Sequence, residues 1–328
     1  MPTLALIATG GTIAGSGPQH HYTAGVLDAS VLLAAVPELA ALAAWQVEQP
    51  FSIDSRDMQP AHWLDLAARI RQLQVDPSVD GIVITHGTDT LEETAFALHL
   101  LVETTKPVVL TAAMRPASAR SADGPLNLLH AACTALDPLA ALHGVLVTAD
   151  ASVIHAADLL KAHTHKTDAL RCIEGRGLAG QIMADTVRWQ TAAPQRLGLP
   201  ELLALSAGVQ LPRVDVLSAH AGASADLIDF CVTAGARGLV LALTGHGSIP
   251  ADWRTALDRA RSAGVQVVRA SRISAGGVWP GCNEDDEACG CIAAGPHTPQ
   301  QARVLLMLAL AALPDITRSR LAGLFSPD

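Results

Sequence analysis

The chain has 328 residues, of which half are hydrophobic and only 16% are charged, and this composition excludes a disordered chain. Its formal net charge of −9 argues against nucleic acid and anionic membrane surfaces as partners, and no apolar run is long and pure enough to span a bilayer. The length suits one large domain or two medium domains with ample cores.

The cysteine pattern indicates a reducing compartment. Six cysteines are present without the spacing of a disulfide framework. Cys282, Cys289 and Cys291 are clustered, but Cys-x6-Cys-x-Cys is not a standard zinc spacing, so no metal site is predicted there. The chain starts Met-Pro-Thr and enters an apolar run without the features of a secretory signal. We therefore expect a cytoplasmic protein.

The first predicted element is an apolar strand at residues 4–8, followed by Thr-Gly-Gly-Thr-Ile-Ala-Gly at 9–15. A dinucleotide fingerprint needs glycine at its first, third and sixth places, and Thr12 occupies the third, so that fingerprint fails. A phosphate loop is also excluded, because no Gly-Lys-Ser/Thr follows. The polar segment 16–24 contains the only tyrosine, Tyr22, and is predicted to be a mobile loop.

Predicted helices and strands then alternate as far as residue 150. Helices are expected at 28–37 with Asp28 as N-cap, from residue 60, after residue 88, and at 126–136. Strands are expected at 45–47, 82–85, 107–110 and 144–147. This alternation implies right-handed crossovers and a parallel sheet with helices on both faces. Residues 151–180 are polar.

The strand at 82–85 ends in a turn that resembles the first one. Gly87 makes the chain turn sharply, Thr88 or Asp89 falls where a helix N-cap belongs, and acidic residues occupy the first helical turn. Ligands of open parallel sheets bind beyond the carboxyl ends of the strands. Thr12 and Thr88, each following a strand and glycines, therefore predict a chemical site.

A second, smaller α/β pattern follows. Its strands are expected at 214–217, 238–242 and 265–270, and its helices at 225–234, 251–263 and 298–311. We predict a two-domain α/β protein: a larger, Rossmann-like N-terminal domain with a parallel sheet at 1–190, and a smaller C-terminal domain at 213–328. Residues 191–212 are predicted to be a linker with one helical piece.

A threonine hydroxyl is a weak nucleophile and needs a neighbouring group to take its proton. Asp89 is adjacent to Thr88, and a lysine could serve if burial kept it neutral. Lysines are scarce, and Lys161 is the notable one, although composition alone favours a surface position for it. His163 and His165 could bind a metal, but no third ligand has a recognisable spacing.

Four segments resemble signature motifs of the bacterial-type L-asparaginase family. They lie at 9–15, 85–94, 113–128 and 158–169, and the resemblance extends over nearly the whole chain. It implies a larger N-terminal and a smaller C-terminal α/β domain, and an amidohydrolase that converts L-asparagine to L-aspartate and ammonia. It also implies a homotetramer of two intimate dimers, with sites between an N-terminal domain and a neighbour's C-terminal domain, and neither metal nor organic cofactor.

The resemblance also assigns catalytic roles by position. Thr12 matches the nucleophile that attacks the side-chain amide, and Tyr22 matches a loop tyrosine that assists it and closes a lid. Thr88, Asp89 and Lys161 match a second triad that polarises the site and activates water or the hydroxyl. Backbone N–H groups near Thr88 would meet the amide oxygen.

Substrate-binding roles are less uniform. Ser55 and Asp89 match groups that hold the α-carboxylate and the α-amino group. The chain departs from the periplasmic branch in having Arg56 after that serine and His246 in a Gly-His-Gly turn. It also has Asn283, followed by Glu284, where a neighbouring subunit's glutamate would hold the amine. A guanidinium beside Ser55 would strengthen the acid end of the site, and the uncharged asparagine would weaken the amine end.

These departures leave alternatives open. One is an amidase of the same fold that acts on D-asparagine, on glutamine, or on an amide lacking the α-amino group. Another is the ammonia-supplying subunit of a tRNA-dependent amidotransferase, which usually needs an extra N-terminal module. A third is a non-catalytic sensor of small molecules, although such a sensor would tolerate loss of Thr12 or Lys161, and both are present.

Overall fold

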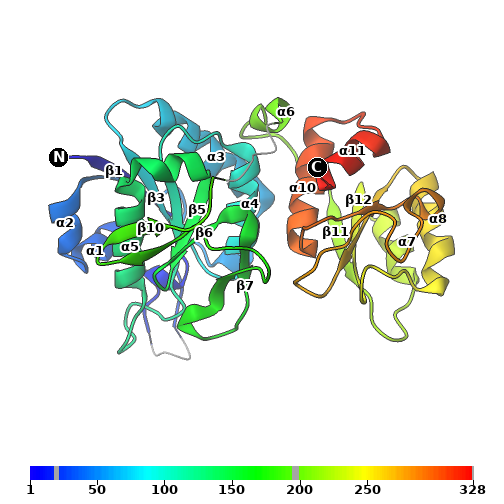
Figure 1. The fold of residues 1–328 in the computed structure, drawn as a ribbon, viewed down its shortest axis with the longest axis horizontal. Helices are drawn as coiled ribbons and strands as arrows, with labels where there is room; N and C mark the ends of the chain where they lie inside the picture. Colours follow the sequence, from blue (N-terminus) through cyan, green and yellow to red (C-terminus); the bar gives the residue numbers. More distant parts are fainter. Residues whose placement is uncertain (18–21, 194–198, 327–328) are drawn as a thin grey trace. The chain divides into compact units, whose positions relative to one another are not determined.

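The computed structural model describes residues 1–17, 22–193 and 199–326 (Figure 1). It divides into two compact units, Met1–Arg196 and Leu197–Asp328, and each is described by itself. The predicted two-domain α/β class is confirmed, since each unit contains a sheet with parallel strands and helices. Across the described residues, no helix is long and apolar enough to cross a membrane.

The N-terminal unit is built on an eight-stranded sheet with the order β10-β9-β6-β5-β4-β3-β1-β2. Strands β2 to β5 and β1 pair in parallel, whereas β6, β9 and β10 form an antiparallel extension beyond β5. The strands are β1 (Thr3–Ala8), β2 (Ala44–Glu48), β3 (Gly81–Thr85), β4 (Val108–Thr111), β5 (Val145–Ala149), β6 (Ser152–His155), β9 (Gly180–Met183) and β10 (Thr186–Trp189).

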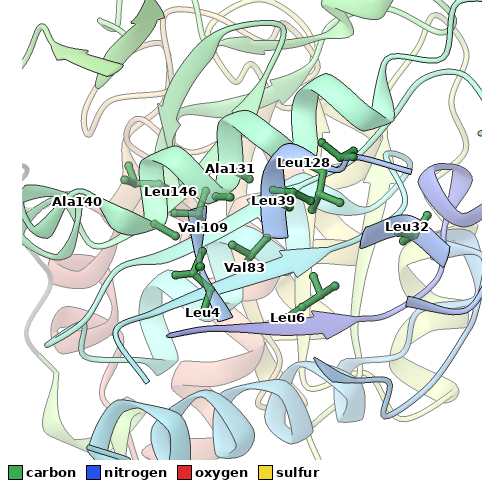
Figure 2. Close-up of a cluster of buried hydrophobic side chains, with 14 of the residues drawn as sticks. Leu4, Leu6, Leu32, Leu39, Val83, Val109, Leu128, Ala131, Ala140 and Leu146 are labelled. Carbon is green, nitrogen blue, oxygen red and sulfur yellow. The ribbon is translucent and has the colours of Figure 1, made fainter. Parts of the chain in front are cut away.

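Both faces of this sheet are buried at the central strands β1, β3, β4 and β5, which explains why these strands appear in the sequence as continuous apolar runs. On one face, Leu4, Leu6 and Val83 pack with Leu128 of helix α5, as Figure 2 shows. Ile82 and Ile84, whose side chains point to the other face of the sheet, are also fully buried. The helices are α1 (Ala29–Ala34), α2 (Glu38–Leu42), α3 (Pro60–Val75), α4 (Leu91–Leu101) and α5 (Gly124–Leu136).

The strand order contains a topological switch point. From β1 the chain moves outward to β2 and then returns past β1 to β3, so the connections after β1 and β3 leave in opposite directions. Ligands of open α/β sheets bind in the crevice at such a point, beyond the carboxyl ends of the strands. Thr12 and Thr88 follow these two strands, so the topology places both turns at one end of the sheet.

The C-terminal unit contains a four-stranded, fully parallel sheet with the order β11-β12-β13-β14. Trp253, completely buried, packs with Ile228 of α7 and Leu257 of α8 in a core on one face, and α10 packs against β11 and β12. The elements are β11 (Val214–Ser218), α7 (Asp226–Thr233), β12 (Gly238–Leu243), α8 (Arg254–Ser262), β13 (Gln266–Ser271), α9 (Asp286–Cys289), β14 (Ile292–Ala293), α10 (Pro299–Ala312) and α11 (Arg318–Phe325).

Several elements differ from the sequence-based prediction. The polar stretch 151–180 holds β6 and a separate two-stranded sheet of β7 (Leu159–Lys161) and β8 (Leu170–Cys172), which are too short to show a clear period. The helix expected at 28–37 ends at Ala34, and α2 follows it; Asp28 caps α1 as predicted. The predicted linker contains the short helix α6 (Pro200–Leu203), and residues 194–198 lie outside the described residues.

The turns after β1 and β3 touch through glycine. Gly11 has φ 79°, and a Cβ on it would collide with the backbone of Gly87. A Cβ on Gly87 would lie 2.5 Å from the Ser55 hydroxyl and 3.2 Å from the Gly11 Cα. Only residues without side chains allow this approach, which places the Thr12 turn directly against the Thr88 turn.

We predict that Gly11→Ala destabilises the protein more than Gly175→Ala. Gly175 has a similar φ of 87° but nothing within 4 Å of a Cβ, so its substitution costs only the backbone strain, about 1 kcal/mol. Gly11→Ala adds a collision worth about 1–3 kcal/mol. Urea unfolding of both variants measures the difference, and an equal loss of stability in the two would contradict the packing argument.

Candidate active site

The turn after β1 presents Thr12 beside Tyr22. Thr12 begins a short 3-10 helix, Thr12–Ala14, and is buried. The Thr12 hydroxyl and the Tyr22 hydroxyl share a hydrogen bond of 2.8 Å. Gly15 lies against the tyrosine ring, since a Cβ on it would be 2.9 Å from Tyr22 Cδ2. The structure therefore brings together the predicted nucleophile and its predicted assistant.

The ends of segment 16–24, which is the predicted lid, lie next to each other. Ser16 and Thr23 exchange two backbone hydrogen bonds of 3.1 and 3.0 Å, which bring the two ends of the segment together. Residues 18–21 of the lid lie outside the described residues. Tyr22 is held just inside the loop, at its junction with the Thr12 turn, and the lid function stays a prediction.

The turn after β3 gathers the second predicted group. The Lys161 ammonium donates a 2.9 Å hydrogen bond to the Thr88 hydroxyl and forms an ion pair with the Asp89 carboxylate. Thr88 is buried, and the Lys161 side chain is only 17% exposed. Lys161 is thus not the surface lysine that composition alone favoured. All three members of the predicted triad lie in contact.

Ser55 is hydrogen bonded to the turn after β3 at two points. Its hydroxyl accepts a 3.1 Å hydrogen bond from the backbone N–H of Asp89, and its carbonyl accepts one of 2.7 Å from the Thr90 hydroxyl. The expected N-cap is wrong: Thr90, not Thr88 or Asp89, precedes α4, and it makes no side-chain cap. The side chains of this turn are committed to Lys161 and Ser55, and so they do not cap the helix.

Arg56 does not join the cluster. Its guanidinium forms an ion pair of 2.9 Å with Asp54, and the side chain is 72% exposed. The short 3-10 helix Ser55–Asp57 turns Ser55 inward and Arg56 outward, toward solvent. The inference that Arg56 reinforces the acid end of the site therefore loses its geometric support.

Glu284, in the C-terminal unit, is already engaged within that unit. Its carboxylate accepts a 2.9 Å hydrogen bond from the backbone N–H of Ile249 and pairs with Arg254 at 2.9 Å, and its side chain is only 8% exposed. Both carboxylate oxygens thus have partners. The Glu284 side chain is thus held in one position by its own unit, and its negative charge is paired with Arg254.

The other two predicted residues of that unit also bond locally. The Asn283 amide donates a 3.1 Å hydrogen bond to the Ser248 hydroxyl, and Asn283 has the left-handed φ of 61°. His246 Nε2 accepts a 3.4 Å hydrogen bond from the backbone N–H of Trp279. Their roles toward a substrate stay predictions.

Two titratable residues of the second motif had no predicted role. His86 is completely buried, and this burial lowers its pKa to about 4, while Nδ1 bonds the Gly87 carbonyl at 2.7 Å. Glu92 accepts a 3.1 Å hydrogen bond from the backbone N–H of Lys161, and burial raises its pKa. Both residues lie inside the family-like segment 85–94. The sequence could not show what Glu92 contacts, because its partner Lys161 is 69 residues away along the chain.

Metal ligation has no support in the described parts of the chain. They contain no group of three or more His, Cys, Asp or Glu side chains that could hold an ion. His163 and His165 meet edge to face, with ring centroids 4.5 Å apart, and His163 Nδ1 accepts a hydrogen bond from the His165 backbone. All six cysteines are free thiols.

The arrangement suits acyl transfer through a hydroxyl nucleophile. Two buried threonine hydroxyls lie on touching turns, and each is hydrogen bonded to a second polar group. One hydroxyl can attack a carbonyl carbon while the other orients a second reactant, and backbone N–H groups of glycine-rich turns can meet the developing oxyanion.

Comparison with known proteins covers nearly the whole chain. A family profile described as "Asparaginase, N-terminal" matches residues 3–195, and one described as "Glutaminase/Asparaginase C-terminal domain" matches residues 213–321. The chain is 38% identical to "Probable L-asparaginase periplasmic" of Haemophilus influenzae over 318 residues, which are 96% of this chain and 90% of that one.

Two further proteins show the range of the relatives. "Glutaminase-asparaginase" of Pseudomonas fluorescens biotype A is 35% identical over 320 residues, covering 96% of this chain and 88% of the relative. The crystal structure of a "Probable Cytoplasmic L-asparaginase" from Campylobacter jejuni is 36% identical, with a TM-score of 0.92 over 99% of both chains.

We predict that His86 makes the protein less stable in acid. Because its folded-state pKa, about 4, lies below its ordinary value of 6.5, the unfolded chain binds the proton more readily. Stability from the neutral ring is therefore complete above pH 6.5 and falls by on the order of 3 kcal/mol as the pH drops to 4.

Urea unfolding from pH 7 to pH 4 tests this, with His86→Gln as the control that cannot take up the proton. The wild type should lose more stability over this range than the variant. Parallel curves for the two proteins would show that His86 titrates normally.

Proposed function

This chain belongs to the asparaginase family, and from that membership we propose that it hydrolyses the side-chain amide of L-asparagine to L-aspartate and ammonia. The observation that carries the proposal is the contact between the two threonine-bearing turns at the β1/β3 switch point. Thr12 is bonded there to Tyr22, and Thr88 to Lys161.

In the proposed reaction, Thr12 Oγ1 attacks the amide carbon while its proton passes to the Tyr22 oxygen and the Tyr22 hydroxyl gives its own proton to the leaving nitrogen. Backbone N–H groups near Thr88 stabilise the tetrahedral oxyanion. The C–N bond then breaks, and the nitrogen departs as ammonia after taking up a proton. Water, activated by the Thr88–Asp89–Lys161 group, hydrolyses the threonyl ester to release L-aspartate and restore the hydroxyl.

The binding of the amino-acid end is also part of the proposal. Ser55 and Asp89 are proposed to hold the α-carboxylate and the α-amino group, with the bond from the Asp89 N–H to the Ser55 hydroxyl keeping the two side chains together. Glutamine is a second candidate substrate, because the Pseudomonas fluorescens relative is named for both amides. D-asparagine and an amidotransferase role remain rivals without a specific observation in their favour.

Assembly and location are proposed on different grounds. A homotetramer of two intimate dimers is proposed from family membership, and sedimentation of the purified protein would test it. A cytoplasmic location is proposed from the six free thiols and from the Campylobacter jejuni relative's name, although the Haemophilus influenzae relative is named periplasmic. Fractionation of cells that express the natural gene would decide between the two compartments.

Ammonia release from a panel of amides tests the proposed function. The panel should contain L-asparagine, D-asparagine, L-glutamine and succinamic acid, which lacks the α-amino group. L-asparagine should give the highest kcat/KM. A protein that releases no ammonia from any of them, although folded, would not be the proposed hydrolase.

We predict that Thr12→Ala and Thr88→Val each lower kcat by several orders of magnitude without unfolding the protein. Both side chains are small, and the hydroxyl is what each variant removes. Tyr22→Phe removes the partner of Thr12 and should also lower kcat, with little effect on stability. Thr186→Val, on the exposed edge strand β10, is the control. Near-native turnover in both threonine variants would disprove the assignment.

We further predict a weak dependence on the α-amino group. Asn283 carries no charge, and Glu284 is bonded to Ile249 and Arg254. Of the proposed substrate residues, Asp89 is then the one that offers the amine a negative charge, and that charge is already paired with Lys161. A buried ammonium that loses a charged partner typically costs about 3–5 kcal/mol, so a full amine site would favour L-asparagine over succinamic acid by several orders of magnitude. We expect a ratio of kcat/KM values below about 10²-fold. A larger preference that Glu284→Gln abolishes would assign the amine site to Glu284.

A further inference from the structure

Lys161 lies on a hairpin whose two strands do not pair with those of the main sheet. Strand β7 pairs with β8 in a two-stranded sheet of its own, separate from the eight-stranded sheet. A two-stranded ribbon is marginally stable by itself and takes its position from what it packs against. Here β7 packs against α4, and β8 packs against β6 of the main sheet. The place of Lys161 relative to Thr88 therefore depends on contacts between the hairpin and the start of α4.

The base of the hairpin has its own anchor. Asp158, which precedes β7, forms an ion pair with Arg176, and its second carboxylate oxygen lies 3.6 Å from His155 Nδ1. The Asp158 carbonyl accepts a 2.8 Å hydrogen bond from the Ile173 N–H on the other side of the hairpin. These bonds fix where β7 begins, three residues before Lys161.

Glu92 provides the contact at the other end of β7. Its Oε2 accepts the backbone N–H of Lys161 at 3.1 Å, from the first turn of α4. The side chain of the same lysine reaches Thr88 Oγ1 at 2.9 Å and pairs with Asp89. Residues 88–92 thus hold Lys161 twice, by its backbone and by its ammonium. Because Thr88, Asp89 and Glu92 lie within five consecutive residues, the contact with the Lys161 backbone and the contacts with its ammonium are close together on one short segment.

We propose that Glu92 is a positioning residue for the amide hydrolysis: it holds the Lys161 backbone so that Nζ reaches Thr88. The inference rests on the proposed function, because it concerns the same site. Glu92 touches neither Thr12 nor the Thr88 hydroxyl in the structure's hydrogen-bond pattern, so it acts through the lysine. A shift of about 1 Å in a reacting group can cost on the order of 10²-fold in rate.

The ordinary alternative is that Glu92 only stabilises α4, since an acidic residue in the first turn favours the helix dipole. The two roles depend on different properties of the side chain. Positioning needs an acceptor oxygen at the right reach, whereas the dipole effect needs negative charge. Glu92→Gln keeps the reach and an amide oxygen but loses the charge. Glu92→Asp keeps the charge but withdraws the oxygens by one methylene.

Steady-state kinetics with L-asparagine separate the roles. Positioning predicts that Glu92→Asp lowers kcat by on the order of 10²-fold with little change in KM, and that Glu92→Gln stays within about tenfold of wild type. If Glu92 acts only on the helix dipole, Glu92→Gln should be less stable than Glu92→Asp, and kcat should change little in either variant. A kcat in Glu92→Asp equal to that of wild type would overturn the proposal.

A double-mutant cycle shows whether Glu92 acts through Lys161. In a Lys161→Met background, Glu92→Ala should cause no further loss of the residual activity, because the group it positions is already absent. Glu92→Ala alone should reduce kcat at least as much as Glu92→Asp. Losses that add fully in the double variant would mean that Glu92 supports the site independently of Lys161.

Hydrogen exchange provides a test that needs no activity. The backbone amides of 159–161 should exchange faster in Glu92→Ala than in wild type, and Glu92→Gln should restore slow exchange. A wild type that released no ammonia from any amide would contradict the proposed function. The exchange measurement would still test whether Glu92 holds the backbone of Lys161. Unchanged exchange in Glu92→Ala would overturn the inference with the proposed function intact.

Discussion

The contact between Gly11 and Gly87 is the constraint on which the rest of the site depends. Parallel strands bring their carboxyl ends to one edge of a sheet, but adjacent strands alone leave room for side chains between the following turns. Glycine at both positions removes that room, and the Ser55 hydroxyl fills the space beneath Gly87. The backbones of the two threonine-bearing turns are therefore in direct contact, so a displacement of one turn also displaces the other.

The hydroxyl groups and the lysine of the proposed site are held in place in different ways. Thr12, Thr88 and Ser55 are buried and belong to the parallel part of the N-terminal sheet or to the turns bonded to it. Lys161 comes from a ribbon outside that sheet, and side-chain hydrogen bonds to residues 88–92 hold it in place. The buried parallel sheet thus carries the hydroxyls of Thr12 and Thr88, and the β7–β8 hairpin supplies the ammonium of Lys161.

Much of the scaffold could be predicted from the sequence, because a strand buried on both faces needs a continuous apolar run, such as residues 81–85. The family motifs also located Thr12, Thr88 and Lys161, which the structure brings to their expected neighbours. The hairpin of β7 and β8 could not be predicted, because three-residue strands have no measurable period. The outward turn of Arg56 was equally hidden, since one 3-10 turn decides which of two adjacent residues faces solvent.

The separate hairpin also bears on how the site is assembled during folding. Strands β9 and β10 of the eight-stranded sheet follow Lys161 in the chain, so this sheet is complete only after the lysine has been synthesised. Domains generally fold as units, and Thr12, Thr88 and Lys161 belong to one compact unit. We therefore expect the two hydroxyls and the lysine to reach their positions in one folding step, although the lysine lies outside the sheet that carries the hydroxyls.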